Sequence, residues 1–237
     1  MRRIFPDADP APLDDDALAG LYSPADPGRP ALRVNFVSSL DGAVTVEGYS
    51  EGLSGPADKR VFAVLRAVCD ALVVAAGTLR HEGYGPVRVR RPAGHPPLVV
   101  VSRSLDLDPA LPALAEAPVR PYVVTCAAAP ASARNTLARV AEVLVHGDTD
   151  VDLAGAVADL HGRGLRQVLC EGGPHLLGSL VAADLVDEMC LTLSPLLVGA
   201  GPGRMSAGLP APVPRRLGLR HVLAAEDGSL LLRYVHS

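Results

Sequence analysis

A pair of glycines following a short apolar run is the feature of this sequence whose chemistry is easiest to name. Residues 168–180 have the composition of a buried strand, a glycine turn and the start of a helix. Gly172 and Gly173 have no Cβ to hold a ligand away from the backbone, and Pro174 has the fixed φ suited to the first position of a helix. Because the unpaired amides of such a helix start attract anions, we predict a phosphate site formed by Gly172, Gly173, Pro174, His175 and Leu176. A plain strand-to-helix turn is the alternative.

Three further polar turns are expected beside this glycine turn. Apolar runs at 70–76, 97–102 and 120–125 predict strands that are covered on both faces. The carboxyl ends of parallel strands meet at one edge of a sheet, where α/β proteins bind their ligands. The residues expected at that edge are Ala76, Gly77, Thr78, Ser102, Arg103 and Thr125.

The elements that position these turns begin at residue 31. Residues 1–30 are rich in Pro, Asp and Ala with little periodicity, and we predict an extension that packs over the core or is partly ordered. A strand at 32–37 ends in a tight turn at 38–42, and a flexible stretch at 47–52 follows. A helix then begins with Ser54 or Gly55 near the cap and Pro56 at its first position.

The remaining pattern alternates between helix and strand. Residues 77–95 predict a surface loop, 141–145 a strand, and 105–117, 131–140, 150–161 and 176–183 helices. Residues 186–194 alternate as a half-buried strand, while 217–224 and 230–235 flank a hairpin turn at 226–228. The prediction is an α/β domain over 31–237, with a mixed, mostly parallel sheet flanked by helices and antiparallel C-terminal strands.

Composition excludes several classes of protein. In 237 residues with a net charge of −4, no basic run indicates nucleic-acid binding and no apolar stretch is long enough to span a membrane. The N-terminus turns acidic and proline-rich at once, so we expect no export signal and a cytoplasmic location. The four cysteines are scattered without a C-x-x-C pair, which favours buried free thiols over disulfides or a metal site.

Taken together, the motifs resemble the reductase domain of the riboflavin-biosynthesis deaminase/reductase. The matching motifs, in that family's order, are Ser39–Gly42, Leu65–Ala67, Asp70–Ala71, Gly77–Thr78, Glu171–Pro174, Asp184–Glu188 and Ser194–Gly199. The resemblance implies the dihydrofolate reductase fold, NADPH as cofactor, and reduction of the ribose of an aminouracil ribosylamino phosphate to ribityl. Nothing in the sequence resembles the zinc signature of the family's deaminase half.

Roles follow from the resemblance position by position. Gly77, Thr78 and the 172–176 turn match cofactor contacts, and Ser50, Arg66 and Glu171 match substrate contacts. Arg88 lies within a residue or two of a further family arginine. Ser102 and Arg103 are also suited to accept a 2′-phosphate, which favours NADPH over NADH, although Arg103 could equally be a solvated loop residue.

One departure from the family pattern supports a different substrate. Asn35 stands where these reductases usually have a lysine, so a substrate-holding cation is missing from the first strand. Asp58, near a helix start, is similar to the carboxylate that pairs with the pterin ring in dihydrofolate reductases, although an acidic residue is also favoured there by the helix dipole. We therefore take Asp58 and Glu171 as candidate catalytic residues and Asn35, Ser50, Arg66 and Arg88 as candidate substrate contacts. A folate or pterin reductase and a non-catalytic NADPH sensor stay open as alternatives.

The C-terminal strands also suggest an oligomer. Met189, Leu191 and Leu193 fall on one face of the strand predicted at 186–194. The family resemblance implies a homodimer through this region, and burial in the core of a single chain explains the same pattern.

Overall fold

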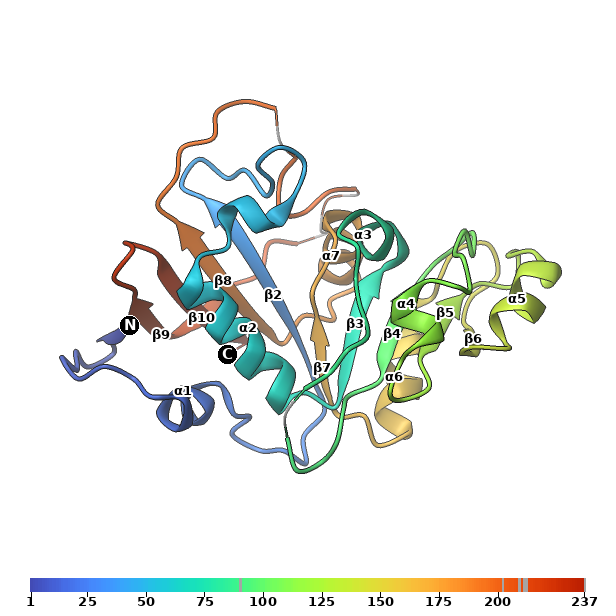
Figure 1. The fold of residues 1–237 in the computed structure, drawn as a ribbon, viewed down its shortest axis with the longest axis horizontal. Helices are drawn as coiled ribbons and strands as arrows, with labels where there is room; N and C mark the ends of the chain where they lie inside the picture. The colour runs from blue at the N-terminus through green and yellow to red at the C-terminus, as the bar shows by residue number, and fades with distance from the viewer. Residues whose placement is uncertain (90, 202, 209, 211–212, 237) are drawn as a thin grey trace.

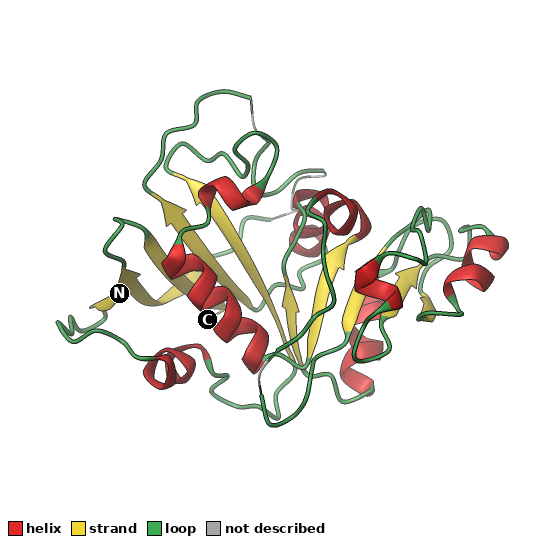
Figure 2. Ribbon diagram, in the orientation of Figure 1, coloured by secondary structure: helices red, strands yellow, loops and turns green. Residues whose placement is uncertain are grey.

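A ten-stranded mixed sheet runs through the molecule, with helices on both of its faces (Figures 1 and 2). The computed structural model describes residues 1–89, 91–201, 203–208, 210 and 213–236. The strands are β1 (Arg2–Phe5), β2 (Ala31–Ser39), β3 (Ala71–Ala75), β4 (Leu98–Val101), β5 (Tyr122–Thr125), β6 (Glu142–Val145), β7 (Gln167–Cys170), β8 (Glu188–Ser194), β9 (Leu217–Ala224) and β10 (Leu230–His236). The helices are α1 (Asp15–Tyr22), the 3-10 turn η1 (Ser50–Leu53), α2 (Pro56–Val68), α3 (Ala76–His81), α4 (Pro112–Ala115), α5 (Ala131–Leu137), α6 (Leu153–Gly162) and α7 (Pro174–Ala182).

The strand order is β1-β9-β10-β8-β2-β7-β3-β4-β5-β6. From β8 to β6 every neighbouring pair is parallel. On the other side of β8, β10 pairs antiparallel with β8, and β9 pairs antiparallel with β10. The predicted mixed sheet with antiparallel C-terminal strands is therefore confirmed. Because β7 enters between β2 and β3, the carboxyl ends of these three strands are adjacent.

Two hydrophobic clusters cover the two faces of the sheet. Helices α1 to α5 contribute to one cluster, and α6 and α7 contribute to the other. Side chains alternate between the clusters along each strand, so that in β3 Leu72 and Val74 face the first while Ala71 and Val73 face the second. Burial on both faces explains why the central strands are continuous apolar runs in the sequence.

The first 30 residues form part of this core. Strand β1 pairs antiparallel with β9 at the edge of the sheet, and α1 lies against α2 (Figure 1). Leu18 and Tyr22, one turn apart on α1, are 0% and 1% exposed. Asp14 caps the helix by accepting a hydrogen bond from the amide of Ala17. With two core residues on an eight-residue helix, the segment is too short to produce a clear hydrophobic period, and neither element was predicted from the sequence.

Two further predictions were wrong. Residues 77–95 were predicted as loop, but α3 begins directly after β3. The helix predicted at 105–117 is only the single turn α4, because Leu105 has a φ of +55° and Pro109 and Pro112 restrict the backbone before them.

The C-terminal hairpin and the cysteines agree with expectation. Gly228 takes a φ of +88° in the turn, and the amide of Ala225 donates to the carbonyl of Ser229. All four cysteines are free and buried. In the described ranges, no helix combines the length and the apolarity that crossing a bilayer requires.

Candidate active site

A cleft of about 550 Å³ opens at the carboxyl ends of β2, β7 and β3. Helix α2 and the turn η1 form one wall, and the starts of α3 and α7 form the other. Nine of the predicted site residues line it: Asn35, Ser50, Asp58, Arg66, Gly77, Thr78, Glu171, Gly173 and Pro174. Two of the four predicted polar turns, the one at Gly77 and Thr78 and the glycine turn, therefore border this cleft.

An ion pair lies at the centre of this cleft. Arg66, in the last turn of α2, donates from Nε to Oε1 of Glu171 at 2.7 Å and from Nη2 to Oε2 at 2.6 Å. The hydroxyl of Tyr84 donates to the same Oε2 at 2.9 Å. The guanidinium also lies over the ring of Phe62, 4.2 Å from its centroid. The carboxylate of Glu171 therefore accepts two charge-assisted hydrogen bonds from Arg66 and a third hydrogen bond from the phenol of Tyr84.

Burial and charge act together on this cluster. Burial alone would lower the pKa of Arg66, but the hydrogen bonds and the charge of Glu171 outweigh it and raise that pKa. Burial, and next the charge of Glu171, raise the pKa of Tyr84. The side chain of Glu171 is 1% exposed and that of Arg66 is 22% exposed. Arg66 is therefore the member of the pair with surface open to a ligand.

Asp58 and Asn35 occupy the other side of the cleft. Asp58 lies in the first turn of α2, is 5% exposed, and accepts a hydrogen bond from the hydroxyl of Ser54. It is thus both a first-turn acid and a residue of the cleft lining. Asn35 projects from β2 and is also buried. Ser50 begins η1, and its amide donates to the carboxylate of Glu82 at 3.3 Å.

The glycine turn packs closely against its neighbours. Gly173 is the N-cap of α7 and Pro174 its first residue, as predicted. The peptide bond between Gly172 and Gly173 is cis, and the Gly172 carbonyl accepts a hydrogen bond from the amide of Ala75 at 2.8 Å. A Cβ on Gly173 would lie 2.4 Å from Oγ1 of Thr78, and one on Gly172 would lie 3.1 Å from the ring of Phe36. Gly172, with a φ of +106°, has a backbone conformation that favours glycine, and a Cβ on Gly173 would require the hydroxyl of Thr78 to move.

The remaining cofactor candidates lie outside the cleft lining. Ser102 is buried and accepts a hydrogen bond from the amide of Leu105 at 3.1 Å, and the buried Thr125 hydroxyl lies 3.4 Å from the carbonyl of Arg103. Arg103 forms an exposed ion pair with Asp150 at 3.1 Å. These residues follow β4 and β5, the next strands along the same edge. Of the others, Ala76 and Leu176 are buried core residues, and His175 is exposed.

The structure does not bring Arg88 into the cleft. Val87 and Val89 on either side of it are buried, and Arg88 between them is exposed. Pro86 is the last described residue of this segment in the cleft lining.

Comparison with known proteins decides the family. The model of the RibD C-terminal domain matches residues 30–231. This chain belongs to the RibD C-terminal domain family. A 2,5-diamino-6-ribosylamino-4(3H)-pyrimidinone 5′-phosphate reductase from Archaeoglobus fulgidus is 31% identical over 72% of this chain and 83% of its own. The protein of the same name from Methanothermobacter thermautotrophicus is 32% identical over 74% of this chain and 82% of its own.

Solved structures agree with this assignment. A pyrimidine reductase-like protein from Corynebacterium diphtheriae has a TM-score of 0.78 and 27% identity over 87% of this chain and 91% of its own. The resemblance expected from the motifs is confirmed, and with it an oxidoreductase of the pyrimidine reductase family. Reductases of this family use a reduced nicotinamide cofactor, NADH or NADPH.

Sequence reasoning missed several residues of the cleft. Tyr84 and Glu82 fell in a segment predicted as loop, and Phe62 lies on the helix predicted to begin at Pro56 without having been named as a site residue. Lys59, the only lysine of the chain, also lines the cleft and pairs with Glu51 at 3.1 Å. Only the position of Lys59 and Phe62 on the same helix as Arg66, within two turns of it, could have indicated their place.

Proposed function

We propose that this chain is an NADPH-dependent reductase of riboflavin biosynthesis that reduces the ribosyl group of 5-amino-6-(5-phosphoribosylamino)uracil to ribityl. The observation that supports this most is the Arg66–Glu171 pair in a cleft bordered by the glycine turn. Nη1 of Arg66 makes no hydrogen bond with any described residue, so it can donate to a hydroxyl or phosphate of the substrate. Glu171 then acts as the residue that holds this guanidinium in place.

The cofactor fits the wall formed by the starts of α3 and α7. A Cβ on Gly77 would have no heavy atom within 4 Å, so the backbone there is open to close approach by a ligand. Thr78 and the glycine turn enclose the adjoining space. Arg103 follows β4, the next strand along the same edge of the sheet. Its positive charge is suited to a 2′-phosphate, and this supports NADPH over NADH as the cofactor.

In the proposed reaction the side chains bind and orient the substrate, and the cofactor supplies the reactive hydride. When bound, the nicotinamide would supply a hydride to C1′ of the ribosyl group, and the ring oxygen released from C1′ would take up one proton from solvent. Arg66, Ser50 and Asn35 would hold the sugar phosphate, and Asp58 would accept hydrogen bonds from the pyrimidine. The cleft walls would exclude water from the hydride path.

The substrate is tested by side-by-side NADPH oxidation with three compounds. These are the aminouracil ribosylamino phosphate, its diaminopyrimidinone precursor, and dihydrofolate. Fastest turnover of the uracil supports the proposal, and fastest turnover of the pyrimidinone moves the enzyme one step earlier, to the reaction named for the archaeal relatives. Binding of NADPH without turnover of any of the three would instead support the sensor alternative.

A folate or pterin reductase is the second candidate, because Asp58 is a buried carboxylate that lines the cleft. Fastest turnover of dihydrofolate, abolished by Asp58→Asn, would establish it and overturn the first proposal.

Arg66→Lys provides a matched test of the site itself. Lysine keeps the positive charge but cannot donate the two parallel hydrogen bonds of a guanidinium, so KM for the phosphorylated substrate should rise at least about tenfold. Arg88→Lys is the control, since Arg88 is exposed and outside the cleft lining. An equal effect of both substitutions would show that the described cleft is not the substrate site.

We also propose that the chain forms a homodimer through β8 and β10. Met189, Leu191 and Leu193 on β8 are partly exposed, and they pair with Tyr234, Leu232 and Leu230 on β10, also partly exposed. A partly exposed apolar sheet face of this kind is typical of a subunit interface.

A further inference from the structure

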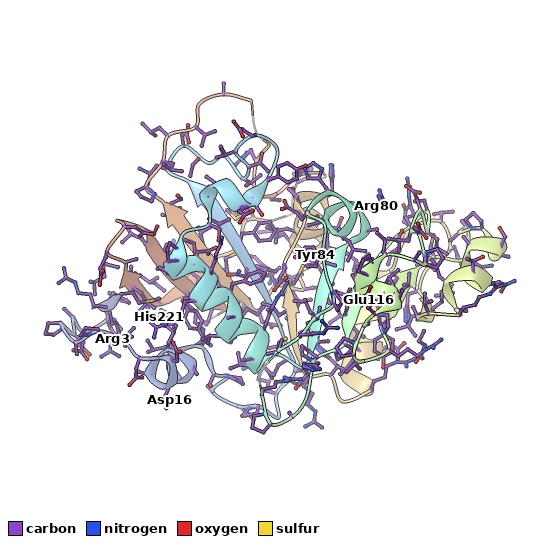
Figure 3. All side chains as sticks on the ribbon, in the orientation of Figure 1. Arg3, Asp16, Arg80, Tyr84, Glu116 and His221 are labelled. Atoms are coloured by element: carbon purple, nitrogen blue, oxygen red, sulfur yellow. The ribbon has the colours of Figure 1, made fainter. Side chains whose placement is uncertain are left out.

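A second cavity, of about 690 Å³, lies at the opposite edge of the sheet from the cleft. Its lining comes from β1, from the end of α1 and the segment after it, from the starts of β2, β7 and β8, and from β9 and β10. Figure 3 shows Arg3 and His221, two of its lining residues, near one end of the molecule and well away from Tyr84 of the cleft. No lining residue is shared by the two cavities.

A buried group with excess positive charge lies beside this second cavity. The carboxylate of Glu188 accepts hydrogen bonds from Arg33 at 2.7 Å and from both Nε and Nη2 of Arg233 at 3.0 and 2.9 Å. Two buried guanidiniums thus share one carboxylate, which leaves a net charge of +1. Burying such a charge is costly unless a further anion compensates it.

The rest of the lining does not remove the excess. Arg3, Arg29 and Arg220 also line the cavity, and the other acids there are Asp26 and Asp187. Both acids already accept hydrogen bonds from backbone amides, of Gly28 and Leu32 respectively. Arg220 is exposed and makes no hydrogen bond or ion pair with any residue that the structure describes.

His221 is the second observation that indicates a ligand. It lies opposite Arg233 on the neighbouring strand, is 2% exposed, and its Nε2 has no hydrogen-bond partner among the described residues. Tyr22 of α1 packs against the ring edge-on at 4.9 Å. Burial, followed by the charges of Arg233, Arg220, Arg3 and Arg33, lowers the pKa of His221 to about 4. An anion in this cavity would therefore lie near the neutral imidazole of His221 and the positive charges of the arginines around it.

We propose that this cavity binds a small dianion of the phosphate or sulfate class, such as the phosphate group of a metabolite. Arg220 contacts the anion at the mouth of the cavity, and the charge shared by Arg33 and Arg233 attracts it inward. The anion weakens the positive field at His221, which then takes up a proton more readily. This site is separate from the reductase cleft, and its existence does not depend on the proposed reaction.

The test uses the full chain and sulfate, whose charge stays constant between pH 4 and 8. Calorimetric titration at fixed ionic strength should show saturable binding with one site per chain. Arg220→Gln should weaken it by ~10-fold, the usual effect of losing one charge-assisted hydrogen bond. Arg139→Gln, at an exposed arginine outside the lining, should leave it unchanged. Absence of saturable binding, or equal losses in both variants, would overturn the proposal.

A second readout addresses His221 directly. In proton NMR, with the signal assigned by comparison with His221→Phe, its titration should move to higher pH when sulfate is added. Sulfate affinity should accordingly rise as the pH falls from about 6 towards 4. A His221 titration that is the same with and without saturating sulfate would show that no anion binds beside it.

Discussion

Arg66 and Glu171, 105 positions apart in the sequence, meet as a two-pronged ion pair in the cleft, with N···O distances of 2.7 and 2.6 Å. Each side chain holds the other in a geometry that neither helix α2 nor strand β7 would impose alone. Glu171→Gln should leave the guanidinium without its charge partner. We expect a loss of about 2 kcal/mol in the free energy of unfolding, which is below the roughly 3–5 kcal/mol of a broken, fully buried pair because Arg66 is partly exposed. We also expect kcat/KM to fall about 100-fold, as for the loss of a positioned charged contact.

Urea unfolding and steady-state kinetics check both values. Glu116→Gln is the matched control, because Glu116 is exposed and does not line the cleft. Unchanged activity in the Glu171 variant would show that the ion pair has no role in the reaction.

Gly173→Ala should destabilise the protein, because the added Cβ would lie 2.4 Å from Oγ1 of Thr78. Adding Thr78→Ala removes that oxygen, so the double variant should unfold at a higher urea concentration than Gly173→Ala alone. Gly173→Val, with a larger side chain, should also prevent NADPH binding. Equal midpoints for the single and double variants would contradict the packing described for this turn.

Gly77→Ala should behave differently. A Cβ there meets no heavy atom within 4 Å, so the free energy of unfolding should hardly change. If the cofactor approaches this backbone closely, NADPH affinity should nevertheless fall by about tenfold. Fluorescence titration with NADPH measures this, and unchanged affinity would place the cofactor elsewhere.

Asp41 should make stability depend on acid pH. Its carboxylate accepts hydrogen bonds from Ser39 and from the amides of Val198 and Gly199, and these lower its pKa to about 2. Because the folded pKa lies below the unfolded value, the stabilisation is complete above about pH 4 and is lost as the pH falls through 2. The difference in urea midpoint between the native protein and Asp41→Asn should therefore shrink from pH 5 to pH 2. A constant difference would show that the carboxylate charge is not responsible.

The four cysteines should react with a thiol reagent only after unfolding. All are buried, and burial raises the pKa of Cys69, Cys170 and Cys190 to about 12, so that almost no thiolate forms at neutral pH. Spectrophotometric thiol counting in buffer and in denaturant checks this. Rapid reaction of the folded protein would mean that the sheet opens readily.

Leu191→Glu should dissociate the proposed homodimer. Leu191 lies opposite Leu232 at the centre of the partly exposed face of β8 and β10, and a charge there cannot be buried against a second copy without cost. Light scattering after size exclusion should show a dimer for the native chain and a monomer for the variant, with matching circular dichroism. A monomeric native chain at micromolar concentration would refute the proposed assembly.

Much of this arrangement could be predicted from local patterns. The central strands are continuous apolar runs, and Pro174 marks the start of α7, so the sheet edge and its glycine turn followed directly. The motifs around Arg66 and Glu171 identified the family before any contact was known. What they did not show is that these two residues bind each other, since a pairing between positions so far apart depends on strand order.

Other features lacked a sequence signal for physical reasons. Tyr84 has no periodic neighbours to place it, and its role comes from the segment that follows α3. Helix α1 is too short for periodicity, although Leu18 and Tyr22 are fully buried. Arg88 matched a family arginine in approximate position only, and a shift of one residue reverses the direction of its side chain between two buried valines.

The strand order has a consequence for synthesis of the chain. Strand β2, which provides Asn35, has β7 and β8 as its two neighbours, and these begin only at Gln167 and Glu188. Strands β3 to β6 can pair with one another as they leave the ribosome. The backbone hydrogen-bonding groups on both edges of β2 stay unpaired until residues 167–194 have been made. An apolar strand in that state is prone to pair with another chain. Slow translation or truncation before residue 167 would therefore expose this strand to aggregation, and a chaperone that binds extended apolar segments would find its target there.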